Sequence, residues 1–437
     1  MRDGSWWRRT AAATAAVLAL VVPLGGAPAT AEADRGGGSA EVVVAWNQKA
    51  NEIAFAEDQF LTFKGARAYA MAHIAQHDAL NAVVPVYRQF AYVARARRAH
   101  PVVAAAQAAH DVLLEEYPGQ WATLDALLAE HLAGVPDGSS KTAGVALGRR
   151  SAAAILAARV GDGYDVEGTY TFGDDPGDYQ TTPPWDGFVF RPGFRFARPF
   201  AMAAPGQFRP RPPPALASAA YAEAFNEVKD VGRVDSQHRT AEQTGYAVWW
   251  MEFAEGSMNR LARNLATRTS LDPWRAARLF AQLNVGLFDS YLAVWDAKFH
   301  YDHWRPYTAI REAASDGNPR TAPDPTWEPL RTTPPFPDYV SAHSAVCGSS
   351  MEILRRTFRD GTRFTMDSAT APPDMPTRSF DSFSAAADEC ADSRVRLGFH
   401  FRYATDQGKR LGRKVALRIH RHWFQPTPNS VVRRGTA

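Results

Sequence analysis

Cysteine is scarce in this 437-residue chain and its charges nearly balance, and each shortage excludes a class of protein. The two cysteines, Cys347 and Cys390, are too few for a zinc-ribbon site, which needs a cluster of Cys and His ligands. In an exported protein such a pair either forms one disulfide or remains as two buried free thiols. Lysine and arginine number 49 against 46 acidic residues, a formal charge of +3. This balance argues against a nucleic-acid partner, because nucleic-acid-binding proteins normally carry a clustered basic face.

Long apolar runs are also missing, except near the N-terminus. Three arginines precede an apolar run over 11–24, and small residues follow up to Ala31. This is the layout of a secretory signal peptide that is cleaved near Ala31. The alternative is a membrane anchor, but the run falls short of the ~20 apolar residues that span a bilayer, and Pro23 interrupts it. We therefore expect a secreted, extracellular protein with no membrane contact after cleavage.

Helical periodicity dominates the rest of the chain, and no alternation of strands and helices is visible. It runs over 43–160, with proline breaks, and again from about 218 to 295. Three further helices are expected at 343–358, 383–396 and 403–422. We predict an all-α fold of two packed helical bundles with Pro-rich connecting loops.

Two irregular stretches interrupt this pattern, and they suggest how the chain is divided. Gly, Asp, Pro and aromatic residues fill 161–215, and a second Pro/Asp-rich loop covers 315–338. Long irregular segments in a compact protein are commonly functional, so we expect the first to lie over the helical core as a candidate wall of an active-site mouth. The predicted division is a signal peptide at 1–31, a flexible N-terminus at 32–42, an N-terminal helical part with its Pro/Gly-rich wrap at 43–215, and a C-terminal helical part that carries the site at 216–425.

Three short segments combine cationic, hydroxyl and imidazole side chains. In the first, Lys298 and Arg305 are two helical turns apart, which predicts that they share one face of a helix. Pro306 disfavours helical geometry at the residue before it, so this helix is expected to end at Arg305. In the second segment, Ser341-Ala-His343 directly precedes an apolar helix. Its hydroxyl and backbone N–H groups are therefore expected at a helix N-terminus, which is a natural anion site.

The third segment contains Arg394 and His400, which are six residues apart. On a straight helix this spacing would place them about 120° apart, so they converge only if the chain turns between them. Gly398 permits such a turn. Three cations, a hydroxyl, backbone donors and two histidines together suit a tetrahedral oxyanion. One histidine can then coordinate or attack while the other acts as acid or base.

In this order the segments resemble the three-part signature of the vanadium-dependent haloperoxidase and type 2 phosphatidic-acid-phosphatase superfamily, which is Lys-x₆-Arg-Pro, Pro-Ser-Gly-His and Ser-Arg-x₅-His. Further runs at 301–311, 323–327 and 72–81 resemble its bacterial secreted haloperoxidase branch, so the likeness covers about 43–422. The resemblance implies a vanadate cofactor and an enzyme that uses hydrogen peroxide to oxidise chloride or bromide, which then halogenates small organic substrates.

The resemblance also implies a role for each residue of the signature. The predicted ligands of the vanadate oxygens are Lys298, Arg305, Ser341, the backbone N–H of Ala342, and Arg394. His400 would coordinate vanadium, or attack phosphorus in a phosphatase. His343 would be the acid/base, and Lys298 is counted with the two histidines as catalytic.

Trp295 and Phe336 stand where chloroperoxidases have aromatic residues near the halide. The resemblance implies a halide pocket there, and ordinary core packing is the alternative. Another pair, His73 and His77, is four residues apart on one helical face, but no third ligand has a matching position. That pair is therefore expected to make structural hydrogen bonds rather than to hold a metal.

The chain departs from the family pattern at three positions. Val340 and Ala342 stand where Pro and Gly are usual, and Ala404 stands where many phosphatases have an Asp four residues after the last His. Without that Asp, His400 needs another hydrogen-bond partner. Two alternatives to the haloperoxidase therefore stay open, namely a secreted acid phosphatase with a phosphohistidine intermediate and an oxyanion-binding protein that lacks catalysis.

Overall fold

The computed structural model describes residues 40–59 and 63–428. The predicted signal peptide at 1–31 lies outside the described residues. So does most of the predicted flexible N-terminus, although Glu41 already begins the first helix. Among the described helices, none is long and apolar enough to cross a membrane.

Helices make up most of the described chain, as predicted. The first half contains α1 (Glu41–Asp58), α2 (Lys64–Val83), α3 (Pro101–Glu116), α4 (Trp121–Ala133) and α5 (Ser139–Ala158). The second half contains α6 (Ala219–Val231), α7 (Ala241–Trp249), α8 (Ala254–Arg268), α9 (Pro273–Tyr301), α10 (Pro306–Arg311), α11 (Ala342–Phe358), α12 (Phe383–Arg396) and α13 (Arg402–His422). Short 3₁₀ turns, η2 (Pro118–Gln120), η3 (Pro192–Phe196), η4 (Pro205–Phe208) and η5 (Ala313–Ser315), lie in the connections.

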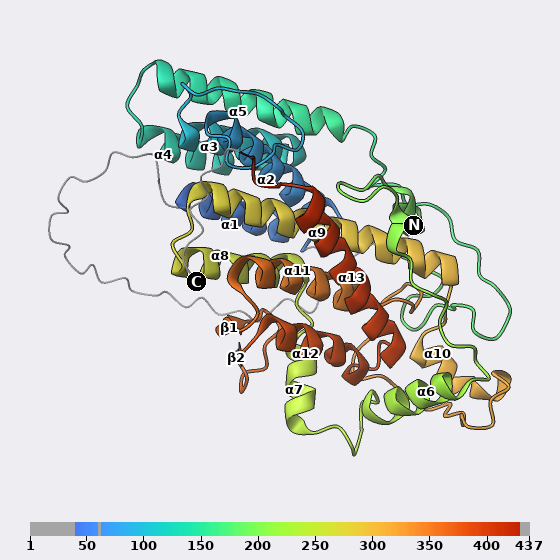
Figure 1. The fold of residues 1–437 in the computed structure, drawn as a ribbon. Coiled ribbons are helices and arrows are strands. Elements are labelled where there is room, and N and C mark those ends of the chain that lie inside the picture. The colour runs from blue at the N-terminus through green and yellow to red at the C-terminus, as the bar shows by residue number, and fades with distance from the viewer. Residues whose placement is uncertain (1–39, 60–62, 429–437) are drawn as a thin grey trace. The chain divides into compact units, whose positions relative to one another are not determined.

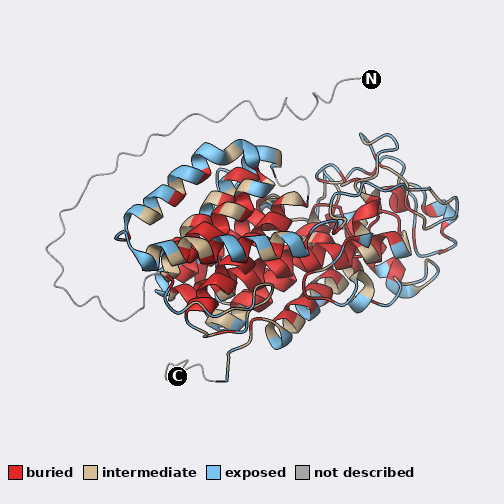
Figure 2. Cartoon of the chain, turned by 90° about the horizontal axis from the view of Figure 1, so that it is seen from above, coloured by how far each residue is buried: buried red, intermediate tan, exposed pale blue. Residues whose placement is uncertain are grey.

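One helix, α9, is central to the packing. It lies between a group formed by α2, α3 and α5 and a second group formed by α11, α12 and α13 (Figure 1). Nearly every residue of α9 up to Phe299 is buried, which is the pattern of a helix that is covered on all sides. Figure 2 shows the buried residues concentrated along these central helices. The all-α prediction of two packed bundles is confirmed.

Local signals in the sequence explain where α9 begins. The Asp272 side chain accepts a hydrogen bond from the backbone N–H of Arg275, and Pro273 occupies the first helical position. The close packing of α13 on α11 has an equally local cause. A Cβ atom on Gly412 would lie 1.8 Å from the carbonyl oxygen of Ala345, so only glycine permits this approach.

The irregular segment 161–215 is ordered along the second half of α9, as predicted. The Asp289 carboxylate on α9 accepts backbone N–H groups from Phe200, Ala201 and Met202, at distances of 2.7–3.1 Å. Burial raises the pKa of Asp289 to about 6, and these three donors oppose the rise. The segment is therefore attached to the central helix through a buried carboxylate.

Two features differ from the sequence-based expectation. A small antiparallel hairpin of β1 (Phe364–Asp367) and β2 (Thr377–Phe380) was not predicted, because four-residue strands carry too little periodicity. The predicted boundary between the two helical parts, at 215–216, stays a prediction, since the contacts gather the described residues into one compact unit.

Candidate functional site

The three predicted segments meet at one place in the fold. Their residues come from the last turn of α9 (Lys298), the link before α10 (Arg305), the start of α11 (Ser341, Ala342 and His343), the last turn of α12 (Arg394) and the link before α13 (His400). Arg305 connects two of the segments directly. Its Nη1 donates to the Phe399 carbonyl oxygen at 2.9 Å and lies 3.3 Å from Nε2 of His400.

The predicted geometry of the first segment was wrong by one turn of helix. α9 ends at Tyr301, because Asp302 adopts a left-handed conformation with φ 48°. Lys298 and Arg305 therefore do not share one helical face, as their spacing had predicted. Instead, Arg305 is extended, as expected for a residue before proline, and the turn at Asp302 brings its guanidinium back toward the end of α9.

The cations of the site are buried, and one carboxylate accompanies them. Lys298 and Arg305 are fully buried, and Arg394 is 7% exposed. Lys298 Nζ donates to the carbonyl oxygens of Pro337 and Asp338, at 2.5 and 3.0 Å. Desolvation, reinforced by the neighbouring guanidinium groups, holds the pKa of Lys298 well below its usual range. It likewise lowers the pKa of Arg394 to about 9.

Several donors of this cluster have no hydrogen-bond partner among the described residues. They are Nη2 of Arg305 and both Nε and Nη1 of Arg394. Buried polar groups are nearly always satisfied, and unpaired buried charge is strongly unfavourable. These donors fit an oxyanion, whose oxygens accept several N–H groups and neutralise the clustered positive charge. The residues present therefore match the requirements of vanadate or phosphate.

The start of α11 adds backbone donors to this cluster, as predicted. Ser341 is the N-cap, and its Oγ accepts hydrogen bonds from the N–H and the hydroxyl of Ser344, at 3.3 and 2.9 Å. Ala342 opens the 17-residue helix, so its N–H belongs to the positive end of the helix dipole. The substitution of Ala for the usual Gly is accommodated without a left-handed backbone at this position.

His343 and His400 are in different surroundings. His343 is half-buried, and burial together with the charge of Arg394 holds its pKa well below the usual value, although a hydrogen bond to the backbone of Trp250 opposes the shift. His400 is 2% exposed, and burial followed by the charge of Arg305 lowers its pKa as well. Both imidazoles are therefore neutral near pH 7.

Gly398 provides the turn that the spacing of Arg394 and His400 required. α12 ends at Arg396, and Gly398 adopts φ 79°, a conformation that is natural for glycine. A Cβ atom there would also lie 2.6 Å from the carbonyl oxygen of Gly232. The prediction of a glycine turn between the two functional residues is confirmed.

The sequence analysis missed one residue of the candidate site, Asp338. Its Oδ1 lies 2.7 Å from Nδ1 of His400 and 3.8 Å from Nη1 of Arg305. Burial raises the pKa of Asp338 to about 7, and the charges of Arg305 and Lys298 oppose the rise. A signal was present in the sequence, because Asp338 is the only acidic residue in the run 334–344, but the family pattern places the expected carboxylate at position 404, which is an alanine here.

The two predicted halide-pocket aromatics lie against each other and beside the cations. The ring centroids of Trp295 and Phe336 are 5.0 Å apart, and Phe190 of the segment 161–215 packs against both. Lys298 Nζ and the Arg305 guanidinium lie 4.8 and 4.9 Å from the Phe336 ring centroid. Trp295 is 2% exposed, so it is also part of the core. The halide role stays a prediction.

The histidine pair His73 and His77 makes hydrogen bonds within the core. His73 bonds to Asn47 and Gln76, and the His77 ring bonds to Asp78, all within the buried interior. This agrees with the expected structural role of the pair.

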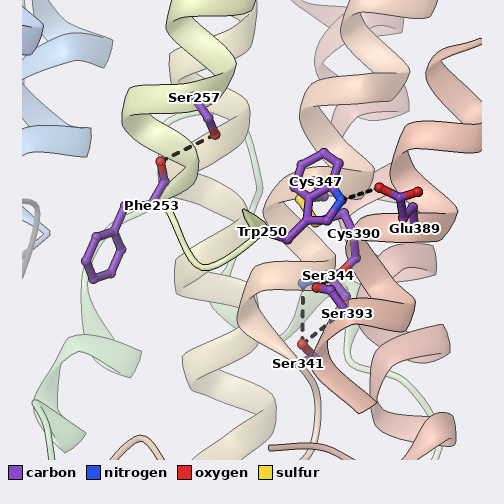
Figure 3. Close-up of a disulfide and its surroundings, with 9 residues drawn as sticks. All are labelled: Trp250, Phe253, Ser257, Ser341, Ser344, Cys347, Glu389, Cys390 and Ser393. Carbon is purple, nitrogen blue, oxygen red and sulfur yellow. Dashed lines mark hydrogen bonds between the residues drawn. A yellow bond between two sulfur atoms is a disulfide. The ribbon is translucent and has the colours of Figure 1, made fainter. Parts of the chain in front are cut away.

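A disulfide joins Cys347 to Cys390, so the first of the two alternatives for these cysteines is confirmed. Figure 3 shows it bridging α11 and α12, with Ser341 and Ser344 below it at the start of α11. Cys347 is one turn after His343, and Cys390 is one turn before Arg394. The two sulfur atoms and a ring nitrogen of His343 lie within 4.8 Å of one another. The disulfide therefore connects the two helices that supply half of the site.

Comparison with known proteins identifies relatives of part of the chain. Residues 278–427 match the family model of the VCPO second helical-bundle domain. The vanadium chloroperoxidase of Curvularia inaequalis is 29% identical over 172 residues, a match that covers 29% of this chain and 28% of that protein. The chain thus matches under a third of the length of this curated relative.

Solved structures extend the similarity to most of the chain. A bacterial vanadium-dependent iodoperoxidase superposes with a TM-score of 0.74 at 26% identity, covering 87% of this chain and 96% of that one. The apo form of a bacterial vanadium-dependent chloroperoxidase superposes with a TM-score of 0.65 at 18% identity, covering 82% and 94%. At that lower identity the likeness concerns the fold alone.

Proposed function

Because this chain has the vanadium haloperoxidase fold and its residues 278–427 belong to the family of the chloroperoxidase second bundle, we propose that it is a vanadate-dependent haloperoxidase. It would use hydrogen peroxide to oxidise chloride or bromide, which then halogenates a small organic molecule. The observation that carries the proposal is the set of buried, unpaired N–H groups on Arg305 and Arg394. They lie together with Lys298, the start of α11 and two neutral histidines.

Each residue of the site has a defined task in this proposal. Lys298, Arg305 and Arg394 neutralise the oxyanion, and the Ser341 hydroxyl with the N–H of Ala342 donates to its oxygens. His400 would coordinate the metal through a ring nitrogen. When bound there, vanadate would act as a Lewis acid that activates peroxide toward a halide.

His343 is the proposed acid/base. Its pKa is held low by burial and by the positive charge of Arg394, so its imidazole is neutral and accepts a proton from peroxide near pH 7. The aromatic side chains of Phe190, Trp295 and Phe336 exclude water beside the cations, which favours oxidation of a desolvated halide.

Halogenation of monochlorodimedone tests this proposal. We expect activity with peroxide and halide only after loading with orthovanadate, and its loss in His400→Ala. His343→Ala should lower the rate by ~10²–10⁴-fold while vanadate still binds, because only proton transfer is removed. His238→Gln, at an exposed histidine outside the site, is the matched control. Chloride, bromide and iodide should all be measured, and vanadate-loaded protein that is inactive with all three would refute the proposal.

One observation favours a second candidate, phosphate-ester hydrolysis by the same site. Asp338 supplies the carboxylate partner of His400 whose absence at Ala404 had argued against a phosphatase. In this reaction His400 attacks phosphorus as the ester P–O bond breaks, and protonated His343 donates its proton to the leaving alkoxide. Water then hydrolyses the phosphohistidine. Turnover of p-nitrophenyl phosphate by vanadate-free protein, lost in His400→Ala, would support it, and no turnover from pH 4 to 8 would refute it.

We also propose that the protein is exported and cleaved after Ala31. The N-terminal arrangement of basic, apolar and small residues supports this, and a buried disulfide is typical of proteins from oxidising compartments. N-terminal sequencing of protein recovered outside the cytoplasm should begin at Glu32. Protein that retains Met1 in every fraction would contradict the proposal.

A further inference from the structure

The contact between Asp338 and His400 joins two links that are 62 residues apart in the sequence. Asp338 lies in the loop before α11, and His400 lies in the link before α13. Their side chains are 0% and 2% exposed, and Oδ1 of Asp338 lies 2.7 Å from Nδ1 of His400. A charge-assisted hydrogen bond of this length in the interior is strong and directional.

The backbone of Asp338 is held on both sides, so its carboxylate has a fixed position. Its N–H donates to the carbonyl oxygen of His303 at 2.8 Å, and its carbonyl oxygen accepts from Lys298 Nζ at 3.0 Å. Both contacts tie the loop to the end of α9. The carboxylate itself contacts the α12–α13 link through its bond to His400. Asp338 therefore connects three parts of the site, which are the end of α9, the loop before α11 and the link between α12 and α13.

This arrangement selects one tautomer of His400. At the pH 8 of the test below, Asp338 is a carboxylate, which only accepts hydrogen bonds, so the proton of the neutral imidazole lies on Nδ1. The lone pair then lies on Nε2. The other side-chain donor beside the ring among the described residues is Nη1 of Arg305, which lies 3.5 Å from Nδ1 and 3.3 Å from Nε2. A donor that faces Nε2 is compatible with a lone pair on that nitrogen, and it leaves Asp338 as the acceptor for an N–H on Nδ1. Histidines that act as metal ligands or nucleophiles are commonly oriented in this way by a partner on the second ring nitrogen.

We propose that Asp338 is the positioning residue of this site, which holds His400 in its rotamer and in the Nδ1–H tautomer so that Nε2 faces the oxyanion. This inference rests on the proposed function, because that function uses His400 as the ligand or nucleophile. Asp338 comes from a different segment of the chain than the Asp that many phosphatases have four residues after the last histidine, where this chain has Ala404. Asp338 acts through His400 and is not itself a reacting group.

The test uses the full-length protein at pH 8 and two measurements. The first is ¹⁵N NMR of histidine-labelled, vanadate-free protein, in which the His400 signals are assigned by their loss in His400→Gln. The wild type should show protonated Nδ1 and unprotonated Nε2. Asp338→Asn should shift His400 toward protonated Nε2 or toward a mixture, because an amide can donate to Nδ1.

The second measurement is orthovanadate affinity by titration calorimetry. Asp338→Asn should bind vanadate ~10–100-fold more weakly than the wild type, as is typical when a ligand's outer partner is removed. The matched control is Asp296→Asn, which changes a carboxylate on α9 that bonds to Arg209 outside the site. Because Asp296 has no contact among the described residues with His400 or with the cations of the site, this variant should keep both the tautomer and the affinity.

The outcomes separate this inference from the proposed function. A protonated Nε2 on His400 in the wild type would overturn the inference whether or not the Asp338 variant folds. Unchanged affinity and tautomer in folded Asp338→Asn would overturn it while the function stood. If the wild type binds no vanadate but Asp338→Asn changes the tautomer, the inference holds and the haloperoxidase proposal fails.

Discussion

Removing the Cys347–Cys390 disulfide tests how the site is held together. The bond links residues 43 apart in the sequence, and both cysteines are fully buried. In the chain-entropy description, closing a loop of this length in the unfolded state stabilises the native state by about 4 kcal/mol at 25 °C. The stabilisation that is measured for a disulfide is often smaller than this value. We therefore expect that removing the bond lowers the free energy of unfolding by roughly 2–4 kcal/mol.

Urea unfolding with and without a phosphine reductant measures this loss. The wild type should become less stable in reductant, because the unfolded chain exposes the disulfide to reduction. The double variant Cys347→Ala/Cys390→Ala should be less stable than the oxidised wild type and insensitive to reductant, which controls for other effects of the reagent. Since each cysteine is one turn from His343 or Arg394, the double variant should also bind vanadate more weakly.

The reasoning would be refuted by a wild type whose unfolding curve is the same in both conditions. Thiol labelling of the unfolded state must show in that experiment that the cysteines are reduced. Weaker vanadate binding at unchanged stability would instead mean that the disulfide orders the site locally without restricting the unfolded chain.

Three further predictions concern the glycine turn, the buried cations and a buried acid. Gly317→Ala, at φ 69° with nothing near its Cβ position, should cost only the ~1–3 kcal/mol of backbone strain. Gly398→Ala should destabilise the protein by more than this and weaken vanadate binding, because its Cβ would also meet the carbonyl oxygen of Gly232. Equal effects of the two variants in urea unfolding would contradict this. Arg394→Met should abolish measurable vanadate binding yet raise the stability of the anion-free protein, because it removes a buried cation that Arg305 repels; a less stable variant would disprove that electrostatic account. Burial raises the pKa of Glu255 from 4.5 to about 7, so the folded state binds more protons than the unfolded state between these values. Stability from this group is thus full below pH 4.5 and is lost as pH rises to 7, by on the order of 3 kcal/mol, and Glu255→Gln should lack this slope in unfolding measurements across that range.

Much of the site was predictable because its parts are local. Ser341 at the start of a helix, the turn at Gly398 and the extended backbone of Arg305 before Pro306 each follow from neighbouring residues, and the structure shows all three. The position where α9 ends was not predictable in this way. It depends on Asp302, whose carboxylate bonds to Tyr170 in the distant segment 161–215, so tertiary contacts determine where the helix stops.

By itself, the sequence determined the helical character of the chain, the anion-binding residue types and the motif order, because periodicity, capping and spacing are properties of short stretches. Only the tertiary structure decided that Asp338 partners His400, that the cysteines bridge α11 and α12, and that Phe190 joins the aromatic residues beside Lys298. These contacts join residues that are far apart along the chain. Many distant pairs are possible, and the packing of the helices around α9 determines which of them form. A pattern in a short stretch of sequence does not predict that packing.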